Sequence, residues 1–174
     1  MMNKSILLMG TLLVSTFVEI AAQKNSENPN IIFVLADDMG IGDLGCYGQK
    51  KIKTPNIDKL AEKGVLFTNH YSGSTVSAPS RCSLLTGKHT GHAYIRGNKG
   101  IKSEEGFFDL HLPSDEVTVA EILKRKGYAT MCVGKWGLGG PHTTGSPVRK
   151  GFDYFFGYLS QGAAHRYYPE YLYE

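Results

Sequence analysis

The centre of this chain is a short stretch that reads Ser77-Ala78-Pro79-Ser80-Arg81-Cys82-Ser83-Leu84-Leu85-Thr86-Gly87-Lys88. Small and polar residues precede it, and Pro79 is compatible with the first turn of a helix, where a missing N–H group costs nothing. Gly87 is typical of the position just after a helix. We therefore predict a short helix that begins at or near Ser77 and ends at Gly87.

This stretch would also place a nucleophile beside a cation. The Ser77 hydroxyl would lie at the positive end of the helix dipole, which favours anions. Arg81 comes one helical turn later and so shares the face of Ser77. A single Ser-x-Pro is most often a capped surface helix with a solvated arginine, because short motifs match many unrelated proteins. The full string is far more specific: Ser77-x-Pro79-Ser80-Arg81, then Leu85-Thr86-Gly87-Lys88.

The string resembles the signature of the type I sulfatases, a family of the alkaline-phosphatase superfamily. In that family the first residue, Cys or Ser, is oxidised after translation to formylglycine, an aldehyde. The resemblance implies that Ser77 is the modified, catalytic residue, with a sulfatase-maturating enzyme of the anaerobic radical type as a partner. It also implies that Arg81 holds the modified residue. Cys82 has no such role, because Pro79 and Arg81 set the frame at Ser77.

A candidate metal site follows the apolar run Asn30-Ile31-Ile32-Phe33-Val34-Leu35-Ala36. Such a run predicts a strand buried on both faces of a parallel sheet, and Asp37 and Asp38 stand at its carboxyl end, where ligands gather. The alternative is a helix cap followed by a turn. The run also resembles the sulfatase N-terminus, where both aspartates bind a divalent metal. The resemblance implies Asp37, Asp38 and Ser77 as ligands of Ca²⁺, with Mg²⁺ also compatible with oxygen ligands.

Further elements bring in a second cation. We predict helices at residues 54–64 and 119–126 and strands at residues 65–69 and 128–134. Lys135 ends the last strand, on the side of the sheet where we expect Asp37. The segment Gly134-Lys135-Trp136 resembles the sulfatase segment whose lysine binds the sulfate oxygens.

The chain departs from the family at Gly137. Sulfatases commonly carry a catalytic histidine two residues after this lysine, and glycine supplies neither a proton nor a charge. Glycan sulfatases with glycine at this place do occur, so we interpret Gly137 as the mark of a subfamily. The general acid for the leaving group is thereby unassigned.

A polar, glycine-spaced loop at residues 89–98 carries two candidate substrate contacts, His92 and Arg96. Loops beside an active site often carry specificity. A role in binding sugar or sulfate and a role as solvated surface residues fit the pattern equally well.

Composition and the N-terminus set the remaining bounds. The chain has 174 residues, 20% of them charged, and a net charge of +3, which is too small to imply nucleic acid. Residues 1–22 resemble a signal peptide in their charge, apolar run and small residues, so we expect export to the periplasm or secretion, with no membrane span after cleavage. Residues 23–29 would then be a flexible linker, and residues 30–174 the N-terminal part of a catalytic domain.

The expected fold is α/β, with a mixed, largely parallel sheet flanked by helices. The expected function is hydrolysis of sulfate esters, on sulfated glycans. Sulfatases are longer than this chain and take further metal ligands from their C-terminal half, so we expect an incomplete and inactive fragment. Two alternatives remain: a phosphate or phosphonate ester hydrolase of the same superfamily, and a non-catalytic glycan-binding module.

Overall fold

The computed structural model describes residues 28–103 and 106–174. The chain divides into two units, Met1–Ala36 and Asp37–Glu174. The predicted signal peptide, and the predicted linker as far as residue 27, lie outside the described residues. None of the helices in the described ranges has the length and apolar character needed to cross a bilayer.

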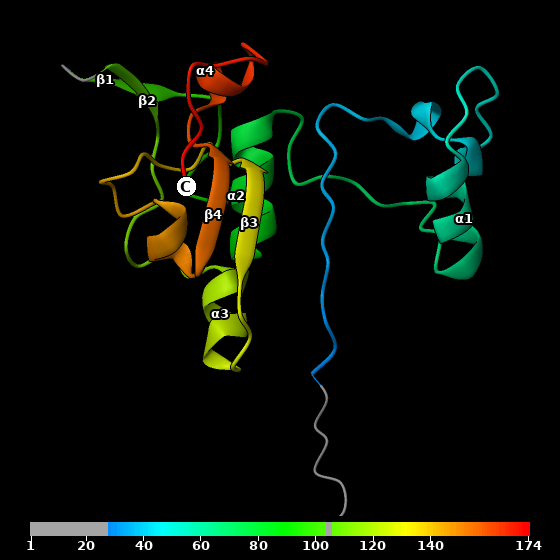
Figure 1. The fold of residues 1–174 in the computed structure, drawn as a ribbon, viewed down its shortest axis with the longest axis horizontal. Helices are drawn as coiled ribbons and strands as arrows, with labels where there is room; N and C mark the ends of the chain where they lie inside the picture. Colours follow the sequence, from blue (N-terminus) through cyan, green and yellow to red (C-terminus); the bar gives the residue numbers. More distant parts are fainter. Residues whose placement is uncertain (1–27, 104–105) are drawn as a thin grey trace, which may run out of the picture. The chain divides into compact units, whose positions relative to one another are not determined.

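The second unit contains helices and two small sheets (Figure 1). The α-helices are α1 (Pro55–Lys63), α2 (Ser77–Thr86), α3 (Val119–Arg125) and α4 (Gln161–Ala164), and the 3₁₀ turns are η1 (Ile41–Asp43), η2 (Gly45–Tyr47) and η3 (Pro147–Lys150). The strands are β1 (Gly100–Ser103), β2 (Gly106–Asp109), β3 (Met131–Lys135) and β4 (Tyr154–Tyr158). β1 and β2 pair antiparallel, whereas β3 and β4 pair in parallel.

The β3–β4 pair positions the end of β3. Its register runs from Met131 opposite Tyr154 to Lys135 opposite Tyr158. Gly157 is required for this pairing, because a β-carbon there would lie 2.0 Å from the carbonyl oxygen of Gly134. The two strands therefore approach too closely for any side chain at position 157.

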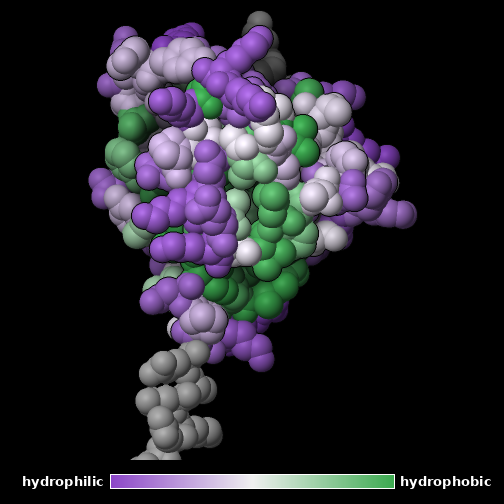
Figure 2. All heavy atoms as spheres, turned by 90° about the vertical axis from the view of Figure 1, so that its right-hand side faces the viewer, coloured by the Kyte–Doolittle hydropathy of each residue, from purple (hydrophilic) through white to green (hydrophobic). Residues whose placement is uncertain are grey.

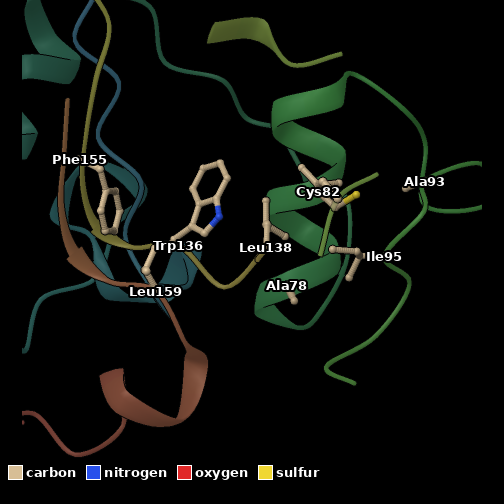
Figure 3. Close-up of a cluster of buried hydrophobic side chains, with 9 residues drawn as sticks. Ala78, Cys82, Ala93, Ile95, Trp136, Leu138, Phe155 and Leu159 are labelled. Carbon is tan, nitrogen blue, oxygen red and sulfur yellow. The ribbon is translucent and has the colours of Figure 1, made fainter. Parts of the chain in front are cut away.

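The core joins α2 to these strands (Figure 3). Ala78 and Cys82 on one face of α2 pack with Leu138 and other buried side chains that follow or belong to β3 and β4. Trp136 is 1% exposed, and its Nε1 donates a 2.7 Å hydrogen bond to the carbonyl of Gly145. The packing holds α2 and the end of β3 in one unit, and these two elements carry the cations of the candidate site.

A buried lysine ties the segment before α3 to η3. Lys150 is 1% exposed, and its Nζ donates hydrogen bonds to the carbonyls of Pro113 at 2.5 Å and Glu116 at 2.7 Å. The Glu116 carboxylate in turn pairs with Lys88, just beyond α2. Nothing in the sequence pattern marked Lys150 as buried, since lysine is almost always exposed unless its charge is satisfied.

Most predicted elements are confirmed, but two predicted strands are wrong. The helices at residues 54–64, 77–87 and 119–126 and the strand before Lys135 all form within a few residues of their expected bounds. Residues 65–69 form no strand. Residues 30–36 form none either, and their side chains are open to solvent, with Ile32 88% and Val34 87% exposed.

Residues 30–36 form no strand because no other strand pairs with them within the described residues. A strand of a parallel sheet needs neighbours on both edges and cover on both faces, and no described residue pairs with residues 30–36. Ile31 to Leu35 are consequently exposed. Figure 2 shows hydrophobic side chains gathered on one face of the molecule.

Candidate active site

Three charged side chains from distant parts of the sequence meet at one point. Lys135 Nζ donates a hydrogen bond to Asp37 Oδ2, and Arg81 Nη2 lies 3.7 Å from Asp37 Oδ1. The side chains of Lys135 and Arg81 are each 11% exposed, whereas that of Asp37 is 50% exposed. The site therefore consists of two nearly buried cations beneath one half-exposed carboxylate.

The electrostatics of Asp37 reflect this arrangement. The hydrogen bond from Lys135 holds the pKa of the Asp37 carboxyl below its usual range. Burial opposes this shift, while the charges of Lys135, Arg81 and His165 add to it. Asp37 is consequently ionised near neutral pH and balances one of the two cations.

The structure of α2 fixes the backbone position of Arg81. α2 begins at Ser77 and ends before Gly87, whose φ of 68° is the left-handed conformation typical of a helix stop. The first turn is held by a 3.1 Å hydrogen bond from the Ala78 amide to Asn98 Oδ1. Ser77 is thus the first helical residue rather than the cap itself, and Arg81 stands one turn after it.

The two side chains of α2 considered as nucleophiles, Ser77 and Cys82, both have a buried reactive atom. The Ser77 oxygen is buried, and it has no hydrogen-bond partner among the described residues, a situation that typically costs about 1–3 kcal/mol. Cys82 is fully buried, and burial raises the pKa of its thiol, so the reactive thiolate is disfavoured. The choice of Ser77 over Cys82 as the catalytic residue stays a prediction.

The described residues do not complete a metal site. Asp37 is engaged by two cations, and the neighbouring Asp38 is exposed, with a φ of 56°. Within the described ranges, no group of three or more His, Cys, Asp or Glu side chains could hold a metal ion. Calcium takes 6–8 oxygen ligands. The assignment of Asp37, Asp38 and Ser77 to a metal stays a prediction.

The two candidate substrate residues of the loop are exposed. Arg96 donates a 3.2 Å hydrogen bond from Nε to the carbonyl of Ala93, three residues earlier. Neither His92 nor Arg96 has an ion pair with Asp37 among the described contacts. Their role in substrate binding also stays a prediction.

A cavity lies at the end of β4 and against α4. It has a volume of about 870 Å³, and its walls include aromatic and charged side chains: Tyr158, Tyr171, Tyr173, His142, Arg166 and Glu170. Tyr158 is the residue opposite Lys135 in the parallel pair. The many tyrosines near the end of the sequence were the only sequence signal for this cavity. Periodicity alone could not show that they line the same cavity.

The comparison with known protein families decides the identity of the chain. The sulfatase family profile matches residues 29–174. The chain belongs to the sulfatase family. The resemblance inferred from the Ser77 string is thereby confirmed over nearly the whole described structure.

Several curated relatives agree with this assignment. The chain is 48% identical over 142 residues to an N-acetylgalactosamine-6-O-sulfatase of Bacteroides thetaiotaomicron, covering 76% of this chain and 27% of the relative. It is 42% identical over 151 residues to human steryl-sulfatase, covering 81% of this chain and 25% of that protein. This sulfatase chain therefore spans about a quarter of the length of the curated relatives it matches.

Solved structures confirm the expected α/β fold. One, from work on the metabolism of multiple glycosaminoglycans by Bacteroides thetaiotaomicron, matches with a TM-score of 0.66 and 45% identity over 76% of this chain and 28% of that one. Another, in complex with its substrate D-glucosamine-2-N,6-O-disulfate, matches with a TM-score of 0.56 and 35% identity over 74% of this chain and 22% of that one.

Proposed function

We propose that this sulfatase chain supplies the nucleophile and the sulfate-binding side of an active site that hydrolyses sulfate esters of glycans. One observation carries the proposal: Arg81 and Lys135, both nearly buried, converge on a single anion next to the helix that begins with Ser77. Two fixed cations suit a sulfate group, since charge in a water-poor site is stabilised best by preorganised partners. In this structure the Asp37 carboxylate is the anion that they hold.

Each residue has a chemical task in this proposal. Lys135 and Arg81 neutralise sulfate oxygens as charge develops on them during attack at sulfur. The residue at position 77 provides the attacking oxygen from the first turn of α2. Oxidation of Ser77 to formylglycine by the maturating enzyme removes two hydrogens and, after hydration, supplies a second hydroxyl. An unmodified serine lacks that hydroxyl and could accept sulfate but not release it.

Asp37 and Asp38 stay candidate ligands for a divalent metal. Their carboxylates are the hard oxygen donors that Ca²⁺ and Mg²⁺ take. The remaining ligands would have to come from residues beyond those described here, in a longer catalytic domain.

Two observations favour a glycan as the substrate. The relatives named above include an N-acetylgalactosamine-6-O-sulfatase and a protein bound to a disulfated glucosamine. The cavity whose wall includes Tyr158 combines tyrosine rings with Arg166 and Glu170, a mixture of apolar and polar groups that suits a sugar. His92 and Arg96, which follow α2 in the sequence, remain candidate contacts to the substrate. We also propose, from the predicted signal peptide alone, that the reaction takes place in the periplasm or outside the cell.

The decisive experiment combines mass analysis with comparative assays. Full-length enzyme produced with its maturating enzyme should show a residue-77 peptide about 2 Da lighter than serine predicts, the loss of two hydrogens that creates the covalent catalyst. It should hydrolyse sulfated sugars in preference to the matching phosphate esters, and Ser77→Ala should abolish this turnover. Full activity with unmodified Ser77 would refute the formylglycine assignment, and a preference for phosphate esters would favour the phosphatase alternative.

A further inference from the structure

The chain that follows α4 forms one wall of the cavity at the end of β4 (Figure 1). Tyr167 has a left-handed φ of 59°, and the chain then returns to β4. There Tyr173 exchanges two backbone hydrogen bonds of 2.9 Å with Gly157. The Tyr158 hydroxyl donates a 3.2 Å hydrogen bond to the carbonyl of Tyr167. This wall is therefore fixed to β4 at two points.

Two side chains of opposite charge, Arg166 and Glu170, line the cavity. Both residues are exposed, and neither forms an ion pair in the part of the chain that the structure describes. A cation and an anion in one cavity largely cancel each other's field, so the cavity does not favour a small free anion such as phosphate. It suits a larger ligand that offers an acid group to the cation and hydroxyl groups to the anion.

Tyrosine rings form the apolar part of the wall. Tyr171 is 65% exposed, and its ring centroid lies 5.4 Å from that of Tyr173, with the ring planes at 79°. This edge-to-face arrangement is a favourable one for an aromatic pair. The backbone of Tyr173 is in turn fixed to Gly157. Tyr171 is thus a supported but open ring, which can stack on the C–H face of a sugar.

The cavity begins next to the strand that carries the proposed sulfate-binding lysine. Tyr158, in the wall, is the residue opposite Lys135 in the parallel pair, and paired strands lie about 4.8 Å apart. Just beyond the strands the Gly137 amide donates a 3.0 Å hydrogen bond to the carbonyl of Leu159, another wall residue. The backbone near Lys135 therefore also forms the edge of the cavity, within reach of a sugar attached to the sulfated one.

We propose that this cavity binds a uronic acid, the acidic sugar that neighbours the sulfated sugar in the glycan chain. This inference rests on the proposed function and narrows its substrate class to acidic glycans. The guanidinium of Arg166 binds the planar carboxylate through two parallel hydrogen bonds, a geometry that arginine matches and lysine does not. Glu170 accepts hydrogen bonds from the ring hydroxyls, and Tyr171 stacks on the ring.

The test measures the binding of unsulfated tetrasaccharides to the full-length enzyme by titration calorimetry, so that no sulfate group contributes. One ligand alternates glucuronic acid with N-acetylgalactosamine, and in the matched ligand each carboxylate is reduced to an alcohol. The acidic form should bind about tenfold more tightly, as expected for one charge-assisted contact at an exposed site. Arg166→Gln should lower this ratio to less than about twofold by weakening the acidic form alone. Arg149→Gln removes an exposed arginine outside the cavity and should leave the ratio unchanged.

A second variant tests the aromatic wall. Tyr171→Ala should weaken both tetrasaccharides by the same factor, of about fivefold, because stacking does not depend on the carboxylate. Equal binding of the acidic and reduced forms to the unsubstituted enzyme, or a tenfold ratio that survives Arg166→Gln, overturns the inference.

Turnover of 4-nitrophenyl sulfate by the same preparation separates this inference from the function on which it rests. If the ester is hydrolysed but the acidic form has no advantage, the proposed function stands and the uronic acid site is refuted. If no sulfate ester is hydrolysed while the acidic form binds through Arg166, the cavity is a uronic acid site and the proposed function fails.

Discussion

Replacing Asp37 with asparagine should strengthen the binding of inorganic sulfate to the 174-residue chain. In the structure the Asp37 carboxylate holds both cations that we assign to sulfate, so it competes with any added anion. Asp37→Asn removes this competing charge but keeps the shape of the side chain. The neighbouring Asp38→Asn is a matched control, because it changes the net charge by the same amount and Asp38 has no ion pair in the described ranges.

The expected size of the effect follows from the geometry. Two unit charges about 4 Å apart, close to the 3.7 Å between Asp37 and Arg81, interact by roughly 4 kcal/mol at an effective dielectric constant of about 20. Asp37 is half exposed, so solvent reduces each pair to about 1 kcal/mol or less. Loss of the pairs with Arg81 and Lys135 should therefore lower the Kd for sulfate by about tenfold, or roughly 1.4 kcal/mol.

Titration calorimetry with sodium sulfate, at constant ionic strength and with a chelator present, measures this difference. Asp38→Asn should shift the Kd by less than about twofold, since its charge is screened by solvent and salt. Lys135→Met should abolish the binding. Equal effects of Asp37→Asn and Asp38→Asn, or sulfate binding that survives Lys135→Met, would show that the two cations do not form the sulfate site.

The remaining predictions concern stability and titration. Lys150→Met should destabilise the chain by about 3 kcal/mol, because one buried and one partly buried carbonyl lose charge-assisted hydrogen bonds. That corresponds to roughly 6–12 °C in Tm for a chain of this size. The fluorescence of Trp136, the sole tryptophan, reports the unfolding, and exposed Arg149→Met is the control, with an expected change under about 0.5 kcal/mol. Lys135→Met should raise the pKa of Asp37 toward its usual value, as followed by carboxyl-carbon NMR. Because the folded pKa is the lower one, Asp37 stabilises the fold above its unfolded pKa of about 3.9, and this contribution is lost as the pH falls through the folded value. An Asp37 pKa that Lys135→Met leaves unchanged would contradict the assigned ion pair.

Local sequence signals determined the parts of this protein that depend on neighbours along the chain. Pro79 and Gly87 predicted where α2 begins and ends, because a proline without an N–H group and a glycine with positive φ act on their own turn of backbone. The placement of Lys135 at the end of a strand also followed from a local apolar run. The family signature around Ser77 is local as well, and the family that it indicated is confirmed by the match over residues 29–174.

Only the tertiary structure decided how distant residues meet. No spacing rule shows that Asp37 binds Lys135, or that Gln161 takes the side-chain space of position 137, because both contacts depend on the packing of α2, β3 and α4. The apolar run at residues 30–36 shows the converse: its composition predicts a buried strand, yet a strand exists only where another backbone satisfies its N–H and C=O groups. Composition sets the tendency of a segment, whereas a partner within hydrogen-bonding distance decides its structure.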